Sequence, residues 1–142
     1  MESFMKYIGR IARCGTMYRA AKLEPYGLNG HQHLYIIKIC DNPGISQENL
    51  AKLIWINKSN VTRQLALLEQ GGFIERRTDP SDKRSQLVYP TKRAHAVYPT
   101  VRQVLQEWNG RIMEGFDEQE REHFLAMLQK MLDKAEQEVS SL

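Results

Sequence analysis

Residues 45–84 read ISQENLAKLIWINKSNVTRQLALLEQGGFIERRTDPSDKR, and this stretch decides the fold. Ser46 and Asn57 are good N-cap residues, and each precedes a run with apolar residues at helical spacing. Trp55 separates the two runs, at a point where many helix-turn-helix units have a small residue, so we expect a longer or more open turn. The pattern predicts two short helices joined by a turn, which is a helix-turn-helix.

The apolar period changes from helical to two directly after Gly71-Gly72, a pair typical of a helix end. Residues 73–78 predict a strand, residues 79–84 a charged turn and residues 85–89 the returning strand. An isolated two-stranded hairpin is only marginally stable, so this one should pack on the preceding helices. The predicted unit is therefore a winged helix-turn-helix.

Long helices are expected on both sides of this unit. Residues 3–23 carry one apolar stripe, and a second helix is expected from Asn29, as its N-cap, to Asp41. Thr91 can cap a further long helix, and Asp117 starts a capping-box pattern ahead of the last one. The predicted fold class is mainly α with a small β-hairpin wing, in which a winged helix-turn-helix is joined to long dimerisation helices.

The second helix of the helix-turn-helix has a polar exposed face without an acidic residue before Glu69. A merely solvated helix face usually carries Glu and Lys at four-residue spacing, which this face does not. Short polar side chains and Arg are suited to reading base edges in the major groove of double-stranded DNA. We expect the base-reading residues to be Ser59, Asn60, Thr62, Arg63 and Gln64.

Basic residues gather in the middle of the chain, although the net charge of the whole is only +3. Residues 46–93 carry nine Lys/Arg and five Asp/Glu, whereas residues 94–142 carry five and nine. A locally basic segment favours a polyanion, and a cationic ribbon tip can reach phosphates or the minor groove. The residues expected to hold the DNA backbone or minor groove are Ser46, Lys58, Arg76, Lys83 and Arg84.

With these residues in place, the chain resembles the MarR family of bacterial transcription regulators. The resemblance covers nearly the whole chain, and its motifs are residues 45–51, 61–63, 67–76 and 79–85. Its strongest element is Asp82-x-Arg84, which is similar to the wing signature of that family. The resemblance implies an obligate homodimer, in which Arg84 enters or skirts the minor groove and Asp82 orients it.

We expect residues 1–142 to form a single MarR-like domain. Residues 29–90 would be the DNA-binding lobe, and residues 1–24 and 91–142 the dimerisation helices. The dimer is also expected without the resemblance, since a small winged domain cannot cover three long apolar stripes and a second copy can. Twofold symmetry would place two recognition helices one DNA turn apart, on a palindromic operator.

The resemblance further implies a repressor that is released by a small aromatic effector. A cleft between the dimer base and the DNA-binding lobe would suit such a ligand. The candidate effector-binding residues are Tyr7, Arg10, Met17, Tyr26, His31 and Tyr35. An alternative is redox sensing by Cys14. In the peroxide-sensing members of the family that the chain resembles, the reactive cysteine lies about two turns earlier in the helix, at a position near Tyr7 here.

Other function classes find little support in the sequence. GxSxG, P-loop, GxGxxG and HExxH motifs are absent, so we expect neither an enzyme nor a cofactor. The four histidines and two cysteines show no metal-ligand spacing, so no metal is expected.

A winged-helix module that docks proteins would need large apolar anchors on the polar face, which this face lacks. Without a signal-peptide core or an 18-residue apolar run, the expected location is the cytoplasm, with no membrane contact.

Overall fold

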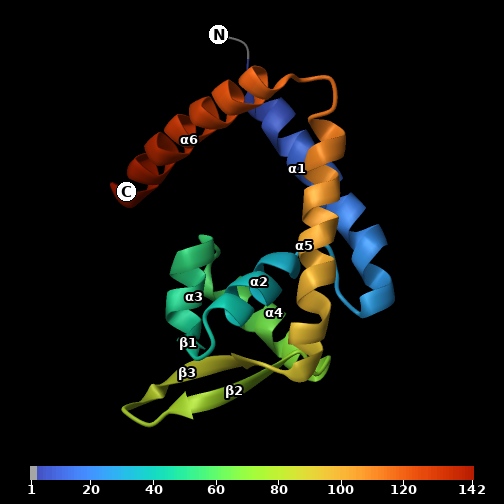
Figure 1. The fold of residues 1–142 in the computed structure, drawn as a ribbon. Helices are drawn as coiled ribbons and strands as arrows, with labels where there is room; N and C mark the ends of the chain where they lie inside the picture. The colour runs from blue at the N-terminus through green and yellow to red at the C-terminus, as the bar shows by residue number, and fades with distance from the viewer. Residues whose placement is uncertain (1–2) are drawn as a thin grey trace. The chain divides into compact units, whose positions relative to one another are not determined.

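The computed structural model describes residues 3–142, and it confirms a mainly helical fold with a small sheet (Figure 1). The helices are α1 (Met5–Leu23), the 3-10 turn η1 (Glu24–Tyr26), α2 (His33–Asp41), α3 (Gln47–Ile54), α4 (Lys58–Gln70), α5 (Lys92–Ile112) and α6 (Glu118–Ser140). The strands are β1 (Ile45–Ser46), β2 (Ile74–Asp79) and β3 (Asp82–Pro90). The chain forms two compact units, of which the first ends at Trp108 and the second is Asn109–Leu142.

The sheet has three antiparallel strands in the order β1-β3-β2, one more than the sequence predicted. The additional strand β1 pairs Ile45 with Val88 and Ser46 with Leu87. Gly44 precedes it at a φ of 86°, and its N–H donates to the carbonyl oxygen of Val88 over 2.8 Å. Two residues are too few to show a period of two, which is why the pattern did not reveal this strand. The strand attaches the start of α3 to the wing.

The turn of the wing is shorter than the six residues predicted. Only Pro80 and Ser81 separate β2 from β3, so Lys83 and Arg84 lie within β3 and not in a loop. The carboxylate of Asp79 accepts hydrogen bonds from the backbone N–H of Ser81 at 2.9 Å and from its hydroxyl at 2.8 Å. These bonds stabilise the tight reversal, and strand pairing continues almost to the tip.

Four of the five N-caps that the sequence predicts are confirmed, namely Ser46, Asn57, Thr91 and Asp117. Ser46 accepts from the N–H of Asn49, and Asn57 accepts from the N–H of Asn60, at 3.1 and 2.9 Å. The prediction that Asn29 caps α2 is wrong, because its side chain accepts from the N–H of His31 and closes a turn before the helix. The loop there is also tight, since a Cβ on Gly30 would lie 2.4 Å from the carbonyl oxygen of Thr16.

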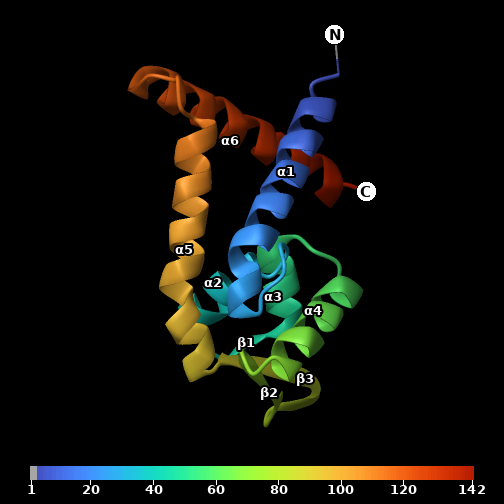
Figure 2. The same ribbon diagram turned by 90° about the vertical axis from the view of Figure 1, so that its right-hand side faces the viewer.

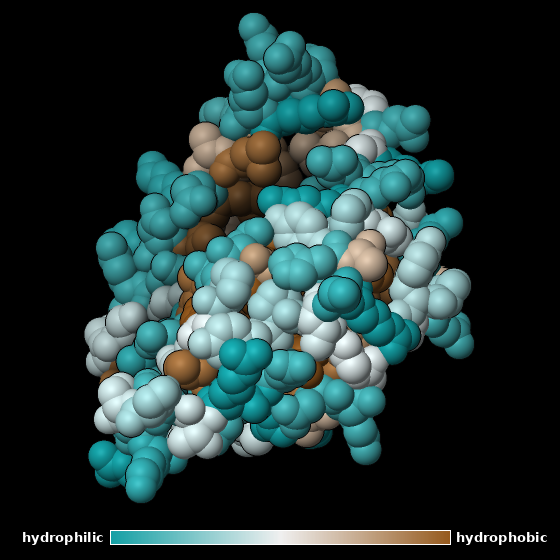
Figure 3. Space-filling model, turned by 60° about the horizontal axis from the view of Figure 1, so that its bottom comes forward, coloured by the Kyte–Doolittle hydropathy of each residue, from teal (hydrophilic) through white to brown (hydrophobic). Residues whose placement is uncertain are grey.

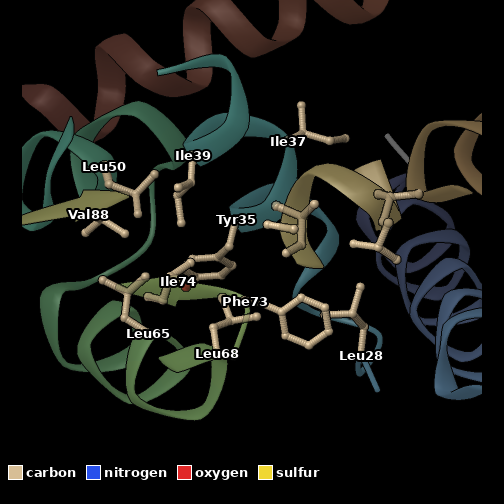
Figure 4. Close-up of a cluster of buried hydrophobic side chains, with 14 of the residues drawn as sticks. Leu28, Tyr35, Ile37, Ile39, Leu50, Leu65, Leu68, Phe73, Ile74 and Val88 are labelled. Carbon is tan, nitrogen blue, oxygen red and sulfur yellow. The ribbon is translucent and has the colours of Figure 1, made fainter. Parts of the chain in front are cut away.

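The core of the first unit surrounds the ring of Tyr35, which α2 projects between α3, α4 and the start of the sheet (Figure 4). Helix α4 contributes its buried side, and β2 is preceded by the fully buried Phe73. Helix α5 also joins this core through residues 94–104. The buried members from α4 and α5 are Val61, Leu65, Leu68, Ala94, Val97, Val101 and Val104. Both faces of α2 are thereby occupied, as its apolar sequence predicts.

The second unit consists of the end of α5, a turn and α6. Asp117 and Glu120 form the predicted capping box, with reciprocal hydrogen bonds of 2.8 and 3.0 Å. Among its described residues α6 has none that is buried, although it carries many large apolar side chains. The exposed ones are Phe124, Leu125, Met127, Met131, Leu132 and Val139. This helix therefore presents apolar surface that its own unit does not cover.

Replacement of Leu65 by Ala should destabilise the protein by about 2–5 kcal/mol, because the fully buried side chain leaves a cavity beneath Tyr35. The free energy of unfolding from urea titration measures this effect. Leu67→Ala is the matched control, since Leu67 lies on the same helix with 46% of its surface exposed and should change stability by less than about 0.5 kcal/mol. Equal losses in the two variants would contradict the assignment of the buried side of α4.

Candidate nucleic-acid interface

Helix α4 presents a polar face at its N-terminal half, as predicted. Ser59, Thr62 and Arg63 are exposed, and Asn60 is half-buried beside them. The side chain of Asn57 anchors this end, because its Oδ1 accepts from the hydroxyl of Ser59 at 2.9 Å as well as capping the helix. The guanidinium of Arg63 donates to Oδ1 of Asn60, so these two side chains lie together on the face.

Gln64 is placed differently from the other four predicted base-reading residues. Its Oε1 accepts hydrogen bonds from Nε2 of Gln32 at 3.3 Å and from Nδ2 of Asn29 at 3.5 Å. Gln32 is a buried polar residue, and Gln64 is half-buried against it. The structure therefore directs Gln64 toward the loop before α2, away from Ser59, Thr62 and Arg63.

The wing supplies an exposed arginine that is held by its neighbour two residues earlier. The carboxylate of Asp82 accepts from the backbone N–H of Arg84 at 3.0 Å and lies 3.6 Å from Nε of the same residue. The side chain of Arg84 is 94% exposed, and Lys83 beside it is exposed as well. Asp82 thus restrains the backbone and the base of the guanidinium while leaving its outer nitrogens in solvent.

A groove of about 450 Å³ lies between α4, the start of α3 and the wing. It is lined by Gln47, Glu48, Lys58, Val61, Thr62, Asp82, Arg84, Ser85 and Gln86. Ser46, another predicted backbone contact, is half-buried at the adjoining end of α3, where its hydroxyl serves as the N-cap. Figure 3 turns the wing end toward the viewer and shows a surface covered mostly by hydrophilic residues.

Arg76 is the predicted backbone contact that the structure separates from the others. Its guanidinium pairs with Glu69 at 2.9 Å, and only 23% of its side chain is exposed. The salt bridge with Glu69 is not shared by the other predicted backbone contacts, namely Ser46, Lys58, Lys83 and Arg84. The salt bridge is formed between residues seven positions apart, one on a helix and one on a strand, which sequence spacing could not indicate.

The turn between α3 and α4 is compact, so the prediction of a longer or more open turn is wrong. Trp55 caps α3 in the left-handed conformation with a φ of 56°, which favours glycine and is uncommon for a bulky residue. The N–H of Ile56 then donates to the carbonyl oxygen of Ala51 over 3.2 Å. The indole lines a shallow groove together with Ala51, Ile56 and Lys58, immediately before the polar face of α4.

The predicted effector-binding residues do not share one environment. Tyr35 is buried in the lobe core, whereas the other five are exposed, namely Tyr7, Arg10, Met17, Tyr26 and His31. Among residues 3–142, two that the sequence did not single out have a buried polar atom without a hydrogen bond, the hydroxyl of Tyr18 and Nδ1 of His33. Burial, followed by the charge of Arg19, lowers the pKa of His33 to about 4, so this imidazole is neutral at pH 7.

The potential metal ligands among residues 3–142 are dispersed over the structure. Within this range no three His, Cys, Asp or Glu residues lie close enough together to hold a metal ion. Cys14 is exposed, and Cys40 is half-buried with its thiol pKa raised to about 11 by burial and then by Asp41. Of the helices described, none combines the length and hydropathy needed to cross a membrane.

Comparison with known proteins agrees with this geometry. The model of the MarR family matches residues 28–86. The chain is 30% identical to the uncharacterised HTH-type transcriptional regulator YybA of Bacillus subtilis, over 97% of this chain and 92% of the relative. A crystal structure of the transcriptional regulator SlyA is 30% identical and superposes with a TM-score of 0.91, covering 96% of each chain.

Similar structures include one that was determined with DNA bound. It is a MarR-family transcriptional regulator from Listeria monocytogenes in complex with a 26mer DNA, with a TM-score of 0.87 and 27% identity. The alignment covers 94% of this chain and 89% of that one. The family match, the relatives and the winged helix-turn-helix agree, and the chain belongs to the MarR family of DNA-binding transcription regulators.

Proposed function

We propose that this chain is a homodimeric repressor that binds a palindromic operator in double-stranded DNA. The observation that supports it is the shared groove, in which Thr62 of α4 and Arg84 of the wing line one surface. In this proposal the recognition helix reads bases in the major groove through Ser59, Asn60, Thr62 and Arg63. Lys58, Lys83 and Arg84 hold phosphates or the minor groove, with Ser46 at the end of α3 and Asp82 orienting Arg84.

The homodimer is supported by exposed apolar side chains on two long helices. Helix α1 exposes Met5, Tyr7, Ile11 and Met17, and α6 exposes the apolar residues described above. Several large apolar side chains exposed on one helix are typical of a surface that contacts another chain. We propose that residues 1–24 and 91–142 form the dimer, of which residues 1 and 2 lie outside the described part, and that residues 29–90 bind DNA. The first half of α5 additionally belongs to the core of the lobe.

Release by a small aromatic effector is supported by the unpaired buried polar groups near α1 and α2. Within the described part of the chain, neither the Tyr18 hydroxyl nor Nδ1 of His33 has a hydrogen-bond partner, which is costly for a buried polar atom. A ligand with a carboxylate or hydroxyl could satisfy such groups while its ring contacts apolar side chains. The five exposed candidate residues would then line the entrance to the effector site. Tyr35 would transmit the effect of ligand binding to α4 through its packing in the core.

Selection of bound fragments from a random DNA pool tests the proposed function directly. The expected result is an enriched palindrome whose half-sites are about 10 bp apart, because twofold symmetry places the two α4 helices one helical turn apart. Enrichment of a single asymmetric half-site would contradict the dimer on DNA. Recovery of unenriched sequences would contradict base reading.

Arg63→Ala and Arg84→Ala should differ in what they do to binding. Arg63→Ala should weaken operator binding by roughly 1–3 kcal/mol and relax preference at one position per half-site, since it removes a base contact. Arg84→Ala should weaken operator and random DNA alike and reduce the slope of log affinity against log salt by about 0.9, since it removes a phosphate contact. Titrations of both variants with both DNAs at two salt concentrations measure this. Equal losses on operator and random DNA for Arg63→Ala would make Arg63 a phosphate contact.

Leu128→Asp should split the dimer or unfold the protein, because it places an unpaired charge in the apolar surface of α6. Leu128 is half-buried, whereas its neighbours along this helix are mostly exposed. Sedimentation velocity and urea titration measure the two outcomes. Gln137→Asp, which introduces the same charge at an exposed polar position of α6, should remain dimeric. A Leu128→Asp dimer with wild-type stability would exclude this face of α6 from the interface.

A further inference from the structure

Arg76 connects three elements of the DNA-binding lobe through its own hydrogen bonds. From β2 its Nε and one terminal nitrogen donate to Oε1 of Glu69 on α4, at 3.2 and 2.9 Å. Its backbone N–H donates to the other oxygen of the same carboxylate at 3.0 Å. The remaining terminal nitrogen donates to Oε1 of Gln47, the first residue of α3, at 3.3 Å. We call this set of Gln47, Glu69 and Arg76 the lobe clamp.

The electrostatics of the lobe clamp differ from those of an ordinary surface pair. The hydrogen bond from the Arg76 side chain is the main cause that lowers the pKa of Glu69 below its usual range, so the carboxylate is ionised at neutral pH. The next residue offers a comparison, since Arg77 makes one 3.0 Å contact with Glu75 and both side chains are about three-fifths exposed. Arg77 has no comparable link to α3 or α4 among the described contacts. The clamp uses the fork of the guanidinium, which a lysine could not reproduce.

The position of the lobe clamp relates the recognition helix to the wing. Glu69 lies in the last turn of α4, whose first turns carry the polar face. Arg76 lies on β2 opposite Val88, and Gln47 directly follows β1, which pairs with β3 on its other side. The side chain of Arg76 therefore spans from one edge of the sheet toward the other while holding the end of α4. Figure 2 shows α3 and α4 next to the sheet that these contacts join.

We propose that Arg76 is a positioning residue for DNA recognition and not a phosphate ligand. Through Glu69 and Gln47 it fixes the orientation of α4 relative to the wing, so that α4 and Arg84 can engage the DNA together. This inference rests on the proposed recognition of DNA by α4 and the wing. The N–H donors of Arg76 already form hydrogen bonds with Glu69 and Gln47. If the guanidinium moved to a phosphate, the ionised Glu69 would lose its partner.

The two roles make opposite demands on the same substitutions. A phosphate ligand needs the positive charge, which Arg76→Lys keeps, whereas the lobe clamp needs the several donors, which Arg76→Lys removes. If Arg76 binds a phosphate, Glu69→Gln would free its side chain and tighten binding to every DNA. If Arg76 is a positioning residue, the same substitution would loosen its side chain and weaken binding to the operator. Glu75→Gln is the matched control, because it removes the same charge from the exposed pair next to the clamp.

The experiment titrates wild type, Arg76→Lys, Glu69→Gln, the double variant and Glu75→Gln with operator and with random DNA at several salt concentrations. Arg76→Lys and Glu69→Gln should each weaken operator binding about tenfold and change random-DNA binding by less than about twofold. The salt slope should stay as in wild type, since no phosphate contact is lost. The double variant should be no weaker than either single variant, because both remove one connected set of bonds.

Several results would overturn the proposal. Wild-type operator affinity in Arg76→Lys, or binding of Glu69→Gln to both DNAs that is tighter than in Glu75→Gln, would make Arg76 a phosphate ligand. Equal losses on operator and random DNA, together with a lower melting temperature, would reduce the clamp to a general stabilising contact. A wild-type protein that selects no DNA sequence would overturn the proposed function itself, and with it the role of the clamp in recognition.

Discussion

The burial of one side of α4 beneath Tyr35 is the contact on which the rest of this lobe depends. Val61, Leu65 and Leu68 recur at steps of four and three, so they occupy one side of the helix. Once that side is buried, the helical period determines which residues face outward. Ser59, Thr62 and Arg63 are exposed for this geometrical reason. The hydrophobic core and the exposed polar face of α4 are therefore two consequences of the same packing.

The sequence allowed prediction of those parts of the fold that depend on neighbours along the chain. The caps by Ser46 and Asn57, the buried side of α4 and the capping box of α6 all involve residues within a few positions of each other. The wing was predicted as a hairpin for the same reason. Its turn was predicted too long, because strand pairing continues to the tip, where the carboxylate of Asp79 accepts a hydrogen bond from the N–H of Ser81. Asn29 was misplaced because a good N-cap residue can equally well close a turn.

The candidate site was harder to predict where partners are distant in sequence. Composition could identify Arg76 and Gln64 as polar residues beside a basic face, but it could not show that each has a partner elsewhere in the lobe. Gln64 bonds to Gln32, and Arg76 reaches Glu69 and Gln47. Arg84 resembles Arg76 in the sequence, yet its guanidinium is almost fully exposed. The difference between these arginines lies in what surrounds each one, and local spacing does not contain that information.

The left-handed Trp55 has a consequence for how this protein can be observed. The chain has two tryptophans, and they lie in different surroundings. Trp55 is half exposed at the turn before α4, whereas the indole of Trp108 packs on the ring of Tyr18 with 5.1 Å between ring centroids. Indole emission depends on the surroundings of the ring, so emission from Trp55 should respond to a molecule that approaches the start of α4, and emission from Trp108 should respond to a change in its contact with Tyr18. The molecule thus contains two native optical probes, one beside each of the surfaces where its partners are proposed to bind.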